Sequence, residues 1–95
     1  MFRLTEHAEP NRLVLKLEGR CSSDVIAALI ASWLAARLKA GTRPIYIDLT
    51  GALVVDDAVR EQLARMHLAG ACFESRGCLM REVVRQITDP PTTGK

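Results

Sequence analysis

The spacing of the hydrophobic residues changes several times along this chain, and that change limits the fold more than any other feature. Leucines alternate with other residues in "RLVLKLEG", residues 12–19, as they do on one face of a strand. Apolar residues then recur at helical spacing between residues 25 and 38, and alternation returns in "RPIYIDL", residues 43–49. Two strands joined by a helix need a parallel crossover, so we predict a sheet with helices packed against it.

The remaining segments complete an α/β fold. "FRLTEH", residues 2–7, is predicted to form a hairpin with residues 12–19 through the turn "AEPN". Apolar residues recur at the helical period within residues 58–70 and within residues 78–87. The segment "ACFES", residues 71–75, is typical of a short strand. We therefore predict a small mixed sheet of about four strands with three helices packed against it. One domain covers residues 1–88, and a disordered, Pro-rich tail covers residues 89–95.

The first helix follows the segment "CSSD", where Ser22 or Ser23 is a candidate N-cap, and Gly41 is suited to its C-terminal end. Its apolar residues predict the face that packs on the sheet. That face is expected to contain Val25, Ile26, Leu29, Ile30, Trp33, Leu34 and Leu38.

Composition excludes several classes of function. The 13 basic and 11 acidic residues are dispersed and only four residues are aromatic, so we expect no nucleic-acid partner. The longest apolar run, residues 25–36, is shorter than the roughly 20 residues of a membrane span, so direct membrane insertion is not expected. The strand-like, charged N-terminal segment predicts no signal peptide, and the location is expected to be cytoplasmic. Three cysteines and two histidines lack the spacing of a metal site, so no metal or cofactor is expected.

Two adjacent carboxylates, Asp56 and Asp57, stand where the central strand segment gives way to the second helix. The simplest interpretation is an N-cap, because an aspartate there accepts from free backbone N–H groups and opposes the helix dipole. A catalytic dyad is a poor alternative, since nothing in the sequence separates the two pKa values. The chain also lacks a Gly-rich phosphate loop. We therefore expect a protein that is not an enzyme.

The element order, with "LVLKLEGR", the long helix and "IYIDLTGALVVDD", resembles the STAS domain of anti-sigma factor antagonists between about residues 2 and 87. The resemblance is most specific at Asp48, which it places at the end of the central strand, and at Asp56 eight residues later. In those antagonists the next residue is a serine that is phosphorylated by a kinase, which is also the anti-sigma factor. This chain has Asp57 there, and Ala58, Val59, Arg60 and Glu61 replace the family's Ser-Gly-Leu-Gly.

An aspartate is only a partial mimic of phosphoserine, which carries about −1.5 to −2 charges. The resemblance therefore implies one of two states. Either the protein is held permanently in a state like the phosphorylated one, or it uses the same surface for a partner that needs no switch. The family's last strand and helix are shortened here, which would leave a sheet edge open and suggests homodimerisation as a hypothesis.

The leading functional hypothesis is a non-catalytic STAS-type interaction module that binds a regulatory protein, such as a kinase-like anti-sigma factor. Its partner surface would include the predicted loop "TGALVV", residues 50–55, and the start of the second helix. The residues assigned to it are Thr50, Leu53, Val54, Asp56, Asp57, Ala58, Val59 and Arg60. Burial of at least one apolar member is the competing interpretation. The alternatives are a cytoplasmic STAS subunit of a lipid or ABC transport assembly, which would dock through the alanine-rich first helix, and a small-ligand-binding STAS domain.

Overall fold

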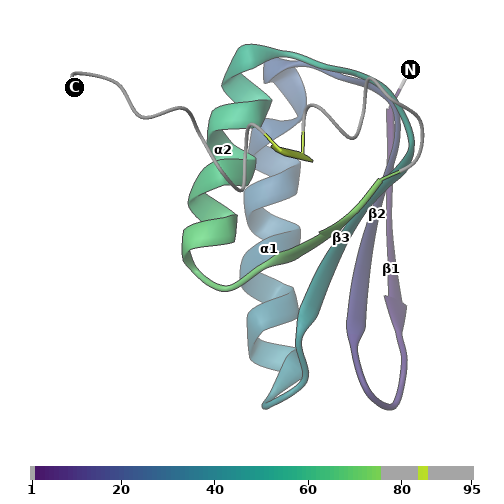
Figure 1. The fold of residues 1–95 in the computed structure, drawn as a ribbon, viewed down its shortest axis with the longest axis vertical. Helices are drawn as coiled ribbons and strands as arrows, with labels where there is room; N and C mark the ends of the chain where they lie inside the picture. Colours follow the sequence, from purple (N-terminus) through teal and green to yellow (C-terminus); the bar gives the residue numbers. More distant parts are fainter. Residues whose placement is uncertain (1, 76–83, 86–95) are drawn as a thin grey trace.

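The computed structural model describes residues 2–75 and 84–85, and these form an α/β fold (Figure 1). In chain order the elements are β1 (Phe2–Ala8), β2 (Leu13–Cys21), the short 3-10 helix η1 (Ser23–Val25), α1 (Ile26–Ala40), β3 (Ile45–Val55), α2 (Asp57–Leu68) and β4 (Cys72–Glu74).

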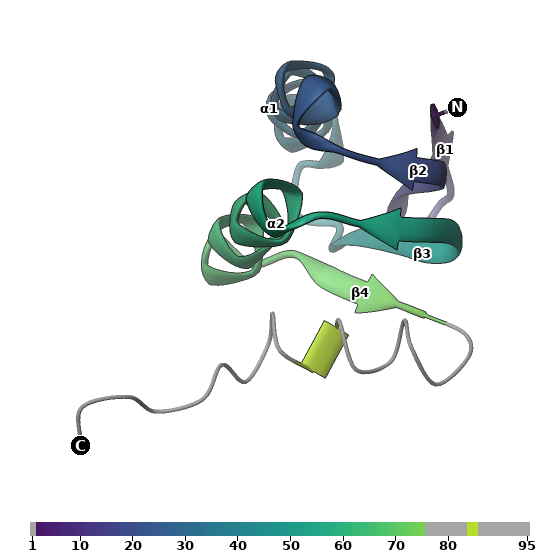
Figure 2. The same cartoon turned by 90° about the horizontal axis from the view of Figure 1, so that it is seen from above.

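The four strands make one mixed sheet, as predicted, and their order is β1-β2-β3-β4. β1 and β2 are antiparallel, whereas β2 pairs with β3 and β3 with β4 in parallel. Both α-helices lie on the same side of the sheet, which leaves the other face without a helix in the described part of the chain (Figure 2). This face of the sheet is called the outer face below.

The described residues contain two α-helices rather than the three predicted. The third was predicted over residues 78–87, and most of that range lies outside the described residues, as does the predicted tail. The two residues described there, Val84 and Arg85, are helical, and Val84 packs against the core.

The core lies between the sheet and the helices, and the alternation in the strands produces it. Leu13, Leu15 and Leu17 of β2 are fully buried, and Ile45, Ile47 and Leu49 of β3 face the same side. The helices contribute narrow stripes at helical spacing. These consist of Leu29, Trp33, Ala36 and Ala40 from α1, and Val59, Leu63 and Met66 from α2.

The predicted buried face of α1 is wrong at two positions, because the side chains of Leu34 and Leu38 are exposed by 54% and 89%. The reason is geometric. A helix that lies on one face of a sheet buries only the stripe that points toward it, and Leu34 and Leu38 fall outside the stripe formed by Leu29, Trp33 and Ala36. Apolar residues on two flanks of the helix give the same sequence pattern as a wide buried face.

β2 and β3 are both longer than predicted. β2 passes through Gly19, which has a φ of 85°, and continues to Cys21, so Gly19 does not end the strand. Residues 50–55, predicted as a loop, are the second half of β3, where Val54 and Val55 pair with Arg20 and Cys21. The β-branched valines favour this extension. Asp48 consequently lies within β3 and not at its end.

The ends of the first helical segment differ in how they are satisfied. Ser22 occupies the position before η1, but its hydroxyl donates to the carboxylate of Asp24 at 2.6 Å and makes no capping bond to the backbone. At the other end, the guanidinium of Arg43 donates to the carbonyls of Lys39 and Ala40, at 2.8 and 3.1 Å. Gly41 follows the helix with a φ of 63°.

Over residues 2–75 and 84–85, no helix has both the length and the apolar character needed to cross a bilayer.

Candidate functional site

The candidate site lies where β3 ends and α2 begins, beside the end of β2. The backbone N–H of Asp56 donates to the carbonyl of Cys21 at 3.0 Å, which ties the start of α2 to the last residue of β2. The backbone N–H of Arg60 then donates to the carbonyl of Asp56 at 2.9 Å and closes the first helical turn. The junction is therefore fixed by backbone hydrogen bonds on both sides.

Of the two aspartates predicted to form an N-cap, Asp56 is the one that caps α2. Its backbone is extended, with φ −79° and ψ 173°, and its carboxylate accepts from the backbone N–H of Val59 at 3.0 Å. This is the usual geometry of a capping aspartate, which satisfies one of the free donors at a helix start.

Asp57 has a different environment. Its side chain is fully exposed, and its carboxylate lies 3.1 Å from Nη2 of Arg60, one turn along α2. The same Nη2 donates to the carbonyl of Val55 at 3.3 Å. The position that resembles the family's phosphoserine thus carries a carboxylate whose charge is partly offset by an arginine of the same helix.

Apolar side chains are exposed next to this pair. Leu53 and Val54, near the end of β3, are exposed by 73% and 44%, and Ala58 of α2 is also exposed. Val55 is buried, so one member of the apolar run belongs to the core. We use the name helix-start surface for Leu53, Val54, Asp57, Ala58 and Arg60.

Two residues that we predicted for the partner surface contribute little to it. Val59 is fully buried, because it lies on the same stripe of α2 as Leu63 and Met66, and it supports the surface from below. Thr50 is half-buried within β3, and its backbone N–H donates to the carboxylate of Asp48 at 2.8 Å.

Asp48 does not join Asp56 in one site. Ile47 and Leu49 on either side of it are buried, so Asp48 points to the outer face, where it pairs in register with Lys16 and Glu74. Eight residues of extended chain separate the two aspartates by about 25 Å. The two positions that carry the STAS resemblance are therefore a structural aspartate inside the strand and a helix cap.

Cys21 lies beneath the helix start and was not predicted as part of the site. It is fully buried, and burial raises the pKa of its thiol, with a smaller contribution from the charge of Asp56. Cys21 and Cys72 are both free thiols. Cys21 could have been assigned to the site only from the strand pairing, because it ends β2 and lies opposite Val55. Among the described residues, no three potential ligands come together as a metal site would require.

Comparison with known proteins supports this description of the fold. No protein-family profile and no curated protein sequence matches the chain. Among solved structures, the anti-sigma factor antagonist SpoIIAA in its unphosphorylated form matches with a TM-score of 0.63 and 18% identity, over 90% of this chain and 83% of that one. An uncharacterised DUF3478-family protein with a SpoIIAA-like fold, from Shewanella loihica PV-4, matches with a TM-score of 0.57 and 14% identity, over 93% and 80%.

A third structure, of a protein named Mglu, matches with a TM-score of 0.57 and 22% identity over 78% of this chain. This chain spans only 19% of that protein's length. Together the matches show that the chain has a SpoIIAA-like fold, so the STAS-like fold expected from the sequence is confirmed.

Proposed function

We propose that this protein is a non-catalytic STAS-type interaction module, a cytoplasmic regulator similar to anti-sigma factor antagonists, that binds a protein partner through its helix-start surface. The observation that carries the proposal is the exposure of Leu53 and Val54 beside Asp57 in a SpoIIAA-like fold. Exposed apolar residues next to charged ones are typical of protein interfaces.

The arrangement of the two carboxylates supports a binding role. Asp56 accepts from the helix backbone and Asp57 pairs with Arg60 at the surface, so each carboxylate has a structural partner and the two are not arranged as a general acid and base. A free helix N-terminus also attracts anionic ligands, but here Asp56 already occupies it. The helix-start surface is therefore better suited to a protein than to a phosphate-bearing small molecule.

The residue at position 57 determines whether phosphorylation can change the charge of the helix-start surface, and here it is Asp57. Because its charge is partly offset by Arg60, it presents less negative charge than a phosphoserine would. We propose that the surface is constitutively available and that its partner is the kinase-like anti-sigma factor type implied by the resemblance. Replacement by serine would restore a phosphorylatable side chain at an exposed position.

The experiment uses purified tagged protein as bait in a lysate of its host, with mass spectrometry of the retained proteins. Wild type is compared with Leu53→Glu, in which a charge replaces the most exposed apolar residue of the helix-start surface. Leu38→Glu is the matched control, because Leu38 is equally apolar and also exposed but lies on α1. Retention of a kinase-like anti-sigma factor by wild type and Leu38→Glu, and its loss with Leu53→Glu, is the expected result.

The captured kinase is then incubated with Asp57→Ser and ATP. We expect phosphate on the new serine and a weaker complex afterwards, since the added charge is larger than that of Asp57. Failure of wild type to retain any kinase-like protein contradicts the proposed partner.

A second candidate function is a subunit of a lipid or ABC transport assembly that docks through α1. The observation that favours it is the exposed apolar side of α1, where Leu34 and Leu38 accompany the exposed Ala27 and Ala31. The same pair of variants tests it. Transporter subunits that are retained by wild type and Leu53→Glu, but lost with Leu38→Glu, would establish α1 as the contact instead.

A further inference from the structure

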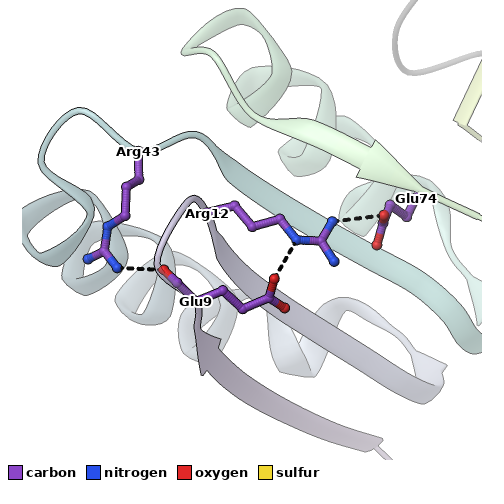
Figure 3. A network of polar contacts seen from close by, with 4 residues as sticks. All are labelled: Glu9, Arg12, Arg43 and Glu74. Carbon is purple, nitrogen blue, oxygen red and sulfur yellow. Dashed lines mark hydrogen bonds and ion pairs between the residues drawn. The ribbon is translucent and has the colours of Figure 1, made fainter.

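Arg12 makes three contacts that connect separate parts of the sheet on its outer face, and Figure 3 shows the two with Glu9 and Glu74. Its Nε donates to the carboxylate of Glu9 at 3.0 Å and its Nη1 donates to the carboxylate of Glu74 at 3.0 Å. Its Cζ lies 5.0 Å from the ring centroid of Tyr46, within the range of a cation–π contact. Arg12 stands just before β2, so its side chain crosses β3 at Tyr46 to reach Glu74 in β4.

β4 is a short strand at the edge of the described sheet, so each contact beyond the strand pairing adds noticeably to what holds it. Its three residues pair with Tyr46–Asp48 of β3, and Phe73 packs partly buried against the core, with its ring 6.1 Å from that of His67. The register also sets Glu74 beside Asp48, so two carboxylates occupy neighbouring strands. Like charges side by side weaken strand pairing, and the guanidinium of Arg12 offsets this repulsion at Glu74.

The hairpin turn on the Arg12 side of this contact is held in place by further hydrogen bonds. Nη1 of Arg43, in the connection between α1 and β3, donates to the carbonyl of Glu9 at 2.9 Å. The backbone N–H of Leu13 donates to the carbonyl of Pro44 at 2.9 Å. The hairpin turn that carries Glu9 and Arg12 is thus held against the end of α1.

We infer that Arg12 and Glu74 form an ion-pair latch that controls how often β4 separates from the edge of β3. The hydrogen bonds to Glu9 and Glu74 raise the pKa of Arg12, which keeps it charged at every physiological pH. The side chains of Arg12 and Glu74 are exposed by 30% and 39%, so dissolved ions reach and screen the pair. β4 therefore separates from β3 more often as ionic strength rises. This separation exposes the backbone of β3 at residues 46–48 to solvent.

Residue-resolved amide hydrogen exchange by NMR tests the latch. In wild type, we expect the protection of the amides of residues 72–74 to fall between about 0.01 M and about 1 M salt, as the Debye length shortens from about 30 Å to about 3 Å. In Arg12→Gln, protection of the same amides should already be lower at low salt, by about five-fold, and should no longer depend on salt. Amides of β1 and α1 should keep their protection in both proteins, which also shows that the variant is folded.

Lys39→Gln is the matched control, because the Lys39–Glu6 ion pair has the same 3.0 Å separation but joins α1 to β1. It should leave the exchange of residues 72–74 unchanged. Glu74→Gln provides the second variant, and it should abolish the salt dependence from the other side of the pair. The latch is ruled out if salt dependence of residues 72–74 persists in both Arg12→Gln and Glu74→Gln, or if wild type shows none.

Discussion

The carboxylate of Asp56 accepts a hydrogen bond from the backbone N–H of Val59, whereas the adjacent Asp57 makes no bond to the helix backbone. Two adjacent aspartates therefore have different environments at the start of α2. Asp56 stabilises the helix, and Asp57 is available on the surface. The pair can be separated experimentally because one substitution should affect folding and the other should affect binding.

Asp56→Ala should lower the free energy of unfolding by about 1 kcal/mol, because it removes the N-cap of α2. Asp57→Ala should leave stability almost unchanged, since its side chain is fully exposed. Urea denaturation followed by circular dichroism measures both. Asp56→Ser, which retains a capping oxygen, should recover most of the loss. An equal loss of stability in Asp56→Ala and Asp57→Ala would show that the cap is assigned to the wrong residue.

The buried thiol of Cys21 should make stability fall with pH above the ordinary thiol range. Its pKa is raised in the folded protein, so the unfolded chain releases the proton first as pH rises. Deprotonation therefore favours the unfolded state, and the stability present below about pH 8.5 is lost progressively as pH rises toward the folded pKa. Urea denaturation at a series of pH values should show a steeper fall for wild type than for Cys21→Ala.

Cys72→Ala is the control for the loss of a thiol, because Cys72 is only half-buried. Alkylation with iodoacetamide gives an independent measure. Peptide mass spectrometry should find Cys72 modified faster than Cys21 in the folded protein. Faster modification of Cys21 would contradict its burial.

Much of the fold is predictable because its signals are local. Leu13, Leu15 and Leu17 alternate with residues of the other face, and this alone predicts a strand with one buried side. Asp56 is predicted as a cap because a capping residue depends only on the few residues that follow it. The mixed sheet then follows from the sequence of elements, because a hairpin is followed by strands that are joined through helices.

The remainder depends on contacts that the sequence does not reveal. Arg12 and Glu74 are 62 residues apart, and only the register of three strands brings them together. Leu34 is predicted in the core because helical spacing identifies an apolar stripe but not its width. The second half of β3 is predicted as a loop, whereas Gly51, Ala52, Val54 and Val55 pair in register with β2.

The exposure of Leu38 can be tested against the burial of Leu29 on the same helix. Leu29→Ala should lower the free energy of unfolding by about 2 to 5 kcal/mol, because it leaves a cavity against the sheet. Leu38→Ala should change it by less than about 0.5 kcal/mol, since its side chain is 89% exposed and alanine favours helix. Thermal and urea denaturation provide the values. A large loss in Leu38→Ala would indicate that this side of α1 is covered by a second molecule or another part of the chain.

Gly51 is required where β3 passes the side chain of Glu18. A Cβ at Gly51 would lie 2.9 Å from Cγ and 3.5 Å from Cβ of Glu18, which is its register partner in β2. The pairing is already irregular there, with a register shift between Lys16 and Glu18. Gly51→Ala should therefore cost about 1 to 2 kcal/mol of stability through overpacking.

Removing Glu18 should relieve that cost, because the three atoms nearest to the new methyl group all belong to Glu18. In a double-mutant cycle, Glu18→Ala alone should have little effect, and combining it with Gly51→Ala should restore part of the loss despite the Cβ that alanine retains. Additive costs in the double variant would mean that Gly51 is needed for its backbone conformation. Its φ lies outside the left-handed region that favours glycine, so close approach is the expected cause.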